Sequence, residues 1–417
     1  MTSIEFLAIL AFIIHARETL EHARFKETSF TRKRGMTFTD ALAFMLDMQK
    51  TSLKTRLDDF YEKGKEGDPI TPQAFSSLRM NFDHSPFQTM VSQAVAGEYS
   101  GQYELPLFHG YHLFGIDGSY LQLPREDALR QEFGTRGRGN TCPEAGISVL
   151  FDVLHDWAVN PILVNADMNE RVECEKHIDF LRLNPCNIAG KSILLLDRGY
   201  PSADLLKKLQ DPQLSTVKFV ARCNSQFLSE INHAPLGDSE VLLKNGVSVR
   251  IIKFVLPSGT IETLATNLFD LPEDLFPELY ALRWGVETAY FKLKEELCVE
   301  KFSGKTPNSI RQDFWASMVL LNAVAVFQHE ADRVVLDRQM GKSLKHEYRA
   351  RTSGLIITLR NRFILAALCG NPTFGLQQMN NVIMTMAREV SPSRSGRSYP
   401  RNFKPAFAAN HNLKSHL

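Results

Sequence analysis

The cysteines of this 417-residue chain are few and follow no recognisable pattern. There are six, none in a CxxC pair and with no evenly spaced framework, so we expect reduced, mostly buried thiols in a cytoplasmic protein. Long apolar runs are also missing. The run Phe6–Ile14 is nine residues long, too short to span a bilayer, and no basic segment precedes it. We therefore expect no signal peptide and no membrane partner, and we interpret this run as a buried helix.

An excess of charge of either sign is absent as well. The net charge is +1, so any basic surface for nucleic acid must be local. The sequence has no HExxH motif and no zinc-type spacing of Cys and His. The Gly-Lys-Ser sequences at 190–192 and 341–343 lack the first glycine of a phosphate-binding loop, because Pro185 and Leu336 stand in its place. The sequence therefore predicts no nucleotide cofactor.

The period of the apolar residues changes along the chain. Residues 1–104 have helical spacing throughout, with Thr37 and Thr39 as candidate helix caps. Several short helices with dispersed basic residues, including the cluster 32–34, fit a DNA-binding domain. They fit a plain helical domain equally well.

Strand patterns dominate the region 105–223, in the order strand, strand, strand, helix, strand, helix, strand. The runs 111–117 and 119–124 are separated by Gly118, which predicts a hairpin-like pair. The Gly- and Arg-rich stretch 133–146 predicts a mobile loop that contacts DNA. The run 191–200 predicts a buried strand that ends in a polar turn.

The second half of the chain adds a β-rich insertion and further helices. Turn signals between short apolar runs predict strands over 224–276. Residues 277–335 contain two strongly helical segments, and helical spacing continues over 336–390. The tail 391–417 carries basic residues without Asp or Glu, so we expect it to be disordered and to bind phosphates non-specifically. The resulting fold class is α/β, with helical regions on both sides of the core.

The segment Glu278–Leu297 has the clearest helical pattern. Its apolar residues share one arc, and a second arc carries a carboxylate, two cations and a phenol. The apolar arc contains Leu279, Leu282, Val286, Ala289, Leu293 and Leu297, and the polar arc contains Tyr280, Arg283, Glu287 and Lys294.

Two further carboxylates end apolar strands, Asp117 in FGIDGS and Asp197 in LLLDRG. Taken singly, each is more typical of a turn or capping residue. An apolar strand that ends in Asp also commonly places a site at a sheet edge, and Glu287 lies on a helix that can pack on that sheet. Three converging carboxylates form a site for Mg²⁺ or Mn²⁺, and two such ions can cleave a phosphodiester. In this combination the metal-site interpretation is favoured.

The spacing Tyr280-(2)-Arg283-(3)-Glu287-(6)-Lys294 resembles the signature of the IS4 family of bacterial insertion-sequence transposases. The DGS around Asp117 and the DRGY at 197–200 resemble that family's two Asp motifs, and the resemblance runs from about residue 30 to the basic tail. It implies an RNase H-like catalytic core, a mixed sheet flanked by helices, interrupted by the β-rich insertion.

The resemblance also implies a function. The protein would be a DDE transposase that cleaves transposon ends and transfers the 3′-OH into target DNA, acting as a homodimer on DNA in the bacterial nucleoid. Asp117, Asp197 and Glu287 would hold two Mg²⁺ or Mn²⁺ ions. Tyr280, Arg283 and Lys294 would contact phosphates, as would Arg198, which could equally be an ion-pair partner of Asp197.

One departure from the family concerns base capture. Some relatives carry a Trp in the insertion, but the three Trp residues here are at 157, 284 and 315, so a hairpin intermediate is not implied. Trp284 is expected to pack on a neighbouring element. Two alternative functions stay open: an RNase H-like DNA nuclease without strand transfer, and a catalytically silent DNA-binding protein descended from a transposase.

Overall fold

The structure is a computed structural model that describes residues 1–31, 35–47, 51–64, 67–137, 139, 141–183, 191–214, 216–344, 346–351 and 372–392. The predicted basic cluster 32–34 lies outside these residues. So do parts of the predicted loop 133–146, the predicted helical residues 352–371, and all of the basic tail from 393 onward.

The first hundred residues form helices, as their spacing predicts. They are α1 (Ser3–His15), α2 (Arg17–Ala23), α3 (Phe38–Leu46), α4 (Leu53–Gly64), α5 (Pro72–Arg79) and α6 (Ser85–Glu98). Thr37 caps α3 and exchanges hydrogen bonds with Asp40, which is a capping box, whereas Thr39 lies inside the helix. The run Phe6–Ile14 is the core of α1, and its predicted burial is confirmed at Phe6, Leu10 and Ile13.

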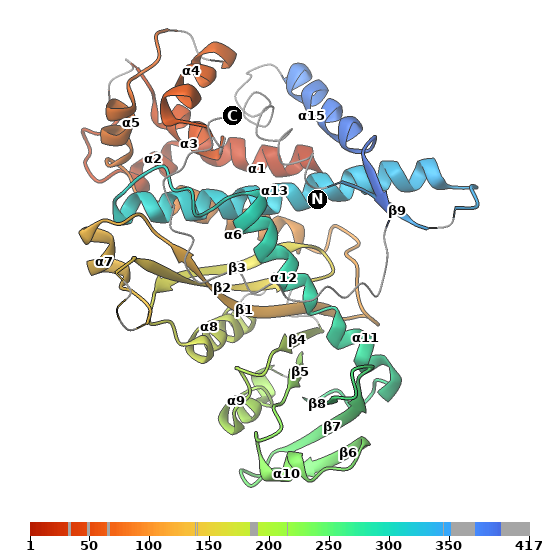
Figure 1. Cartoon of the computed structure of the whole chain (residues 1–417). Coiled ribbons are helices and arrows are strands. Elements are labelled where there is room, and N and C mark those ends of the chain that lie inside the picture. The colour runs from red at the N-terminus through yellow and green to blue at the C-terminus, as the bar shows by residue number, and fades with distance from the viewer. Residues whose placement is uncertain are drawn as a thin grey trace.

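A single eight-stranded mixed sheet forms the centre of the molecule, in the order β3-β2-β1-β4-β5-β8-β7-β6 (Figure 1). The strands are β1 (His112–Gln122), β2 (Glu144–Asp152), β3 (Trp157–Asn165), β4 (Ser192–Leu196), β5 (Val217–Arg222), β6 (Gly237–Leu242), β7 (Ser248–Val255) and β8 (Ile261–Thr266). Strands β1, β4 and β5 run parallel, and the others are antiparallel to their neighbours. The predicted α/β class is therefore confirmed.

The predicted hairpin around Gly118 is wrong. Residues 112–122 form one continuous strand, and its pairing with β2 runs without interruption from Phe114–Asp152 to Gln122–Glu144. Gly118 sits within this ladder, opposite Ser148. A hairpin needs a turn of at least two residues, usually with positive φ, and a lone glycine between two apolar runs does not supply one.

The β-rich insertion joins the same sheet. Strand β8 pairs with β5 in antiparallel fashion, and β7 and β6 follow it to the sheet edge. The short helices α9 (Ala203–Lys208) and α10 (Ser229–Asn232) accompany this part of the chain. The insertion thus extends the core instead of forming a separate lobe, which brings its polar residues beside β5.

Helices cover both faces of the sheet (Figure 1). The remaining ones are α7 (Asp127–Phe133), α8 (Glu170–Leu183), α11 (Phe276–Ala281), α12 (Trp284–Phe291), α13 (Pro307–Gln339) and α15 (Pro372–Met386), and a small β9–β10 pair (Tyr348–Ala350 and Val390–Pro392) lies beside α13. The long helix α13 lies between the N-terminal helices and β3, and α12 crosses β1. No helix in the described ranges is long and apolar enough to cross a membrane.

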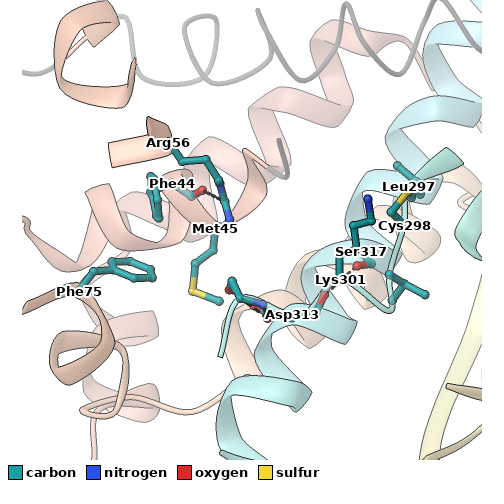
Figure 2. A pocket seen from close by; sticks show the side chains of 11 residues that line it. Phe44, Met45, Arg56, Phe75, Leu297, Cys298, Lys301, Asp313 and Ser317 are labelled. Atoms are coloured by element: carbon teal, nitrogen blue, oxygen red, sulfur yellow. Dashed lines mark hydrogen bonds between the residues drawn. The ribbon is translucent and has the colours of Figure 1, made fainter. Parts of the chain in front are cut away.

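Arg79 connects the N-terminal helices to the core through a buried polar network. Its guanidinium lies 2.8 Å from Asp313 and 2.9 Å from the Gln312 amide oxygen, and the Arg79 side chain is 2% exposed. A cleft lies nearby between the two regions, lined from one side by Phe44 and Arg56 and from the other by residues around Cys298 (Figure 2). None of the predicted site residues lines this cleft.

Candidate active site

The segment that carries Glu287 is helical but not one regular helix. Tight i→i+3 hydrogen bonds from Arg283 to Tyr280 and from Val286 to Arg283 separate α11 from α12. After α12, residues Lys292–Glu296 form a π-helical turn, in which the amide of Leu297 donates to the carbonyl of Lys292. The single helix predicted over Glu278–Leu297 is corrected accordingly. Its predicted apolar face holds, because all its members are buried except the half-buried Leu282.

A glycine allows this helical segment to lie close to β1. A Cβ atom on Gly115 would come within 2.3 Å of the Val286 side chain, so only glycine permits the observed packing. Glu287 follows Val286 directly, and Asp117 lies two residues after Gly115 on the same face of β1. The close approach of the two backbones therefore sets the distance between Glu287 and Asp117.

Strand register brings the two aspartates together. The parallel pairing of β1 with β4 ends with Gly115 opposite Leu195. Asp117 and Asp197 each lie two residues beyond that last pair, so Asp117 lies within β1, beside the point where β4 ends and Asp197 follows. Asp197 follows the end of its strand as the sequence predicts, whereas the prediction that Asp117 ends a strand is wrong, because β1 continues to Gln122.

The guanidinium of Arg283 lies among all three carboxylates. It is 3.1 Å from Glu287, 3.5 Å from Asp197 and 3.9 Å from Asp117. The Arg283 side chain is only 8% exposed, while the carboxylate side chains are 27–35% exposed. Like charges repel at this spacing, and the buried guanidinium supplies the compensating charge. The three acids predicted from the sequence therefore do converge, around a cation that belongs to the chain itself.

Burial acts on Asp117 more strongly than its hydrogen bonds do. Desolvation raises its pKa to about 6, although the Gly118 amide donates to its Oδ1 at 2.9 Å and Arg283 is near. Neighbouring negative charge from Glu170 and Asp197 contributes to the rise. The hydroxyl of Tyr290 donates to the backbone carbonyl of Asp117 at 2.7 Å and links α12 to β1 at this residue. The charged form of the Asp117 carboxylate is thus destabilised by its surroundings.

Asp197 lies in more positive surroundings. The Tyr280 hydroxyl donates to it at 3.3 Å, and the Arg222 guanidinium lies 3.8 Å away. The backbone amide of Arg198 donates to it at 2.8 Å, whereas the Arg198 guanidinium points to Glu262, 3.8 Å away, and is 46% exposed. The alternative of an Arg198–Asp197 side-chain pair is therefore not what the structure shows.

Lys294 contacts the backbone of β1 instead of the three site carboxylates. Its ammonium donates to the backbone carbonyl of Tyr120 at 2.7 Å, and burial lowers its pKa. The π-helical turn contains Lys294, so the regular 100° spacing used to align it with Glu287 does not apply there. The expected packing of Trp284 is wrong, because this side chain is 56% exposed on α12.

Sequence reasoning missed three polar residues around the site. Arg222 and Glu262 form a bidentate ion pair beside Asp197, and Glu262 comes from the insertion strand β8. Glu170, the first residue of α8, lies against Gly118 and Gly199. The one available signal for Glu170 was its place at the start of the helix that follows β3.

The donor set suits a hard divalent cation, because it consists of carboxylate oxygens. As arranged in the described part of the chain, no three such groups are spaced to ligate one ion directly. Instead, in this arrangement the carboxylates are paired with the guanidinium nitrogens of Arg283. The three carboxylates nevertheless supply the kind of oxygen donor that such an ion prefers.

Comparisons with known proteins bear on the fold and on the family of this chain. Residues 147–323 match the family model described as the transposase DDE domain, a stretch that contains Asp197 and Glu287 but begins after Asp117. Among solved structures, the chain is similar to a piggyBac transposase in a synaptic complex with hairpin DNA, at 12% identity and a TM-score of 0.50, covering 90% of this chain and 85% of that one. None of the curated proteins that were compared matches significantly. These similarities confirm the predicted RNase H-like fold and support a DDE-type transposase.

Proposed function

We propose that this protein is an IS4-type DDE transposase that moves an insertion sequence by a cut-and-paste reaction. The observation that carries the proposal is the meeting of Asp117, Asp197 and Glu287 around Arg283, in a chain whose residues 147–323 match a transposase DDE domain. The reaction has two steps. Hydrolysis of a phosphodiester at the transposon end frees a 3′-OH, and that hydroxyl then displaces the leaving oxygen of a target phosphodiester.

The side chains have distinct parts in this proposal. Asp117, Asp197 and Glu287 would hold two Mg²⁺ or Mn²⁺ ions, which activate the attacking oxygen and stabilise the leaving one when bound. The pairs around Asp197, from Tyr280 and Arg222, hold that carboxylate in one orientation. Ordered partners of this kind keep ligands in place and commonly matter about 10–100-fold to metal affinity or activity.

Phosphate contact is the proposed role of Tyr280, Arg283, Lys294 and Arg198. Of these, Arg198 has the most exposed cation in the structure, with 46% of its side chain accessible. Arg283 and Lys294 are already paired, with the carboxylates and with the Tyr120 carbonyl respectively. Their contact with DNA would require a change of partner. DNA, including transposon ends and target, is accordingly the proposed partner, and two ends imply a homodimer acting in the nucleoid.

A strand-transfer assay tests the proposal. The substrate is a pre-cleaved, 3′-OH-ended duplex carrying the inverted repeats that bracket the coding sequence, mixed with plasmid target and Mg²⁺ or Mn²⁺. We expect joined products from the wild-type protein and none from Glu287→Gln. Glu278→Gln is the matched control, since it makes the same change at an exposed residue on the neighbouring helix α11.

The same assay separates the alternative functions. Hydrolysis of the duplex without joining would show a nuclease on the same core. DNA binding without either reaction would show a catalytically silent protein, although the presence of all three carboxylates argues against that outcome. Full activity of Glu287→Gln would refute the metal assignment.

A further inference from the structure

A fourth acidic residue, Glu170, lies against the glycines that follow Asp117 and Asp197. Glu170 begins α8, which follows β3 and packs on the face of the sheet opposite α12. It is half-buried, and it forms no hydrogen bond or ion pair with the described residues. By contrast, the next acids along the same helix are paired, Glu173 with Lys176 and Glu175 with Lys208.

Glycines in both aspartate motifs make room for this carboxylate. A Cβ atom on Gly118, the residue after Asp117, would lie 3.3 Å from Oε1 of Glu170. A Cβ atom on Gly199, two residues after Asp197, would lie 3.0 Å from its Oε2. The two oxygens of Glu170 thus lie one against each motif. They occupy space that any larger residue at those positions would fill.

A buried hydroxyl beside Glu170 gives an independent indication of a polar ligand. Tyr200 is 1% exposed, and within the described ranges its hydroxyl has no hydrogen-bond partner. Tyr200 directly follows Gly199, against which Oε2 of Glu170 lies, and burial together with the charges of Asp117 and Glu170 raises the pKa of its hydroxyl. Buried hydroxyls without a partner are uncommon, and a water molecule on a bound ion would supply this one with a partner.

We propose that Glu170 is a fourth carboxylate of the cation site, which approaches the divalent ion beside Asp117 from the α8 side of the sheet. Asp117 and Gly118 are successive residues of β1, so their side chains face opposite sides of the sheet. An ion at the rim is reached by Asp117 from the α12 side and by Glu170 from the other. The proposal rests on the proposed function, because it assigns a further ligand to the same metal site.

A purely structural role for Glu170 is the competing explanation. A carboxylate in the first turn of a helix interacts favourably with the helix dipole. That role would affect the stability of α8 and leave cation affinity unchanged. A measurement of cation binding therefore distinguishes the two.

The test is Mn²⁺ binding to the full-length, EDTA-treated protein without DNA, followed by the electron paramagnetic resonance signal of free Mn²⁺. Glu170→Gln keeps the shape of the side chain and removes its charge, and we expect it to weaken Mn²⁺ affinity by about 10-fold or more. Glu175→Gln is the matched control, because it makes the same change on the same helix at a residue paired with Lys208. Its affinity should equal that of the wild type. Asp117→Asn should weaken binding at least as much as Glu170→Gln.

Each pattern of results leads to one conclusion. Unchanged affinity in Glu170→Gln, together with loss in Asp117→Asn, would overturn the assignment of Glu170 and leave the proposed function intact. Absence of Mn²⁺ binding by the wild type would overturn the metal-dependent function itself. Should Glu170→Gln fail to fold, Glu170→Asp retains the charge but withdraws it by one methylene. Wild-type affinity in that variant would also count against the proposal.

Discussion

Asp117 should lower the stability of the metal-free protein at neutral pH. Its carboxylate is buried beside other acids, and burial raises its pKa from 3.8 to about 6. A raised pKa means that the folded state binds the proton more tightly than the unfolded state does. The stabilising effect of that proton is complete below the unfolded pKa and is lost as the pH rises through the folded one. Replacement by the neutral isostere, Asp117→Asn, removes this dependence.

The size of the effect follows from the shift. A change from 3.8 to about 6 corresponds to roughly 3 kcal/mol, at about 1.36 kcal/mol per unit. At pH 8 the whole amount opposes folding, whereas at pH 4 less than about 1 kcal/mol remains. Asparagine still accepts the Gly118 amide hydrogen bond, and Arg283 retains two carboxylates, so most of the gain should survive.

The measurement is thermal unfolding in EDTA at several pH values between 4 and 8. We expect Asp117→Asn to melt several degrees above the wild type at pH 8, with a difference that shrinks on acidification. The same variant should lose Mn²⁺ binding. An equal or lower melting temperature at pH 8, or a gain that does not depend on pH, would refute the reasoning about desolvation.

Two further predictions concern the arginines that hold charged clusters. Arg283→Gln leaves three carboxylates without their cation, so the free energy of unfolding in EDTA should fall by about 1–3 kcal/mol. Mn²⁺ should then raise the melting temperature of this variant more than that of the wild type. An equal Mn²⁺ shift in both proteins would contradict the idea that guanidinium and metal compete. Arg79→Met leaves Asp313 buried without its partner and should cost about 3–5 kcal/mol. Because Arg79 pairs with Asp313 and contacts none of the three site carboxylates, Mn²⁺ affinity should not change. A weakened affinity would show that the helices of the N-terminal region are coupled to the carboxylate site.

Local sequence patterns were sufficient to find the three carboxylates. An apolar run followed by Asp marks a strand that carries a carboxylate, and the parallel pairing of β1 with β4 places Asp117 and Asp197 side by side although β1 itself continues to Gln122. Helical spacing around Glu287 separated a buried stripe from a polar one, and the stripe is indeed buried. These inferences succeed because they depend on contacts within one element or between adjacent strands.

Features that depend on distant contacts were not predictable. Whether Gly118 ends a strand or continues it is decided by the length of β2, which pairs with β1 on both sides of the glycine. The π-helical turn at Lys294 changes the register of a segment whose composition is ordinary for a helix. The position of Glu170 depends on the way α8 packs on the sheet, which no spacing within 169–183 reveals.

The pairing of Arg283 has a consequence for the order of events at the site. Its guanidinium is within 3.9 Å of three carboxylates and its side chain is 8% exposed, so little of it is accessible to a phosphate. The family resemblance assigns the same side chain to phosphate. A phosphate at this guanidinium would lie beside three carboxylates, and their negative charges would repel it. Contact with DNA therefore requires another cation to take over the carboxylates, and metal binding and the phosphate role of Arg283 should be thermodynamically coupled.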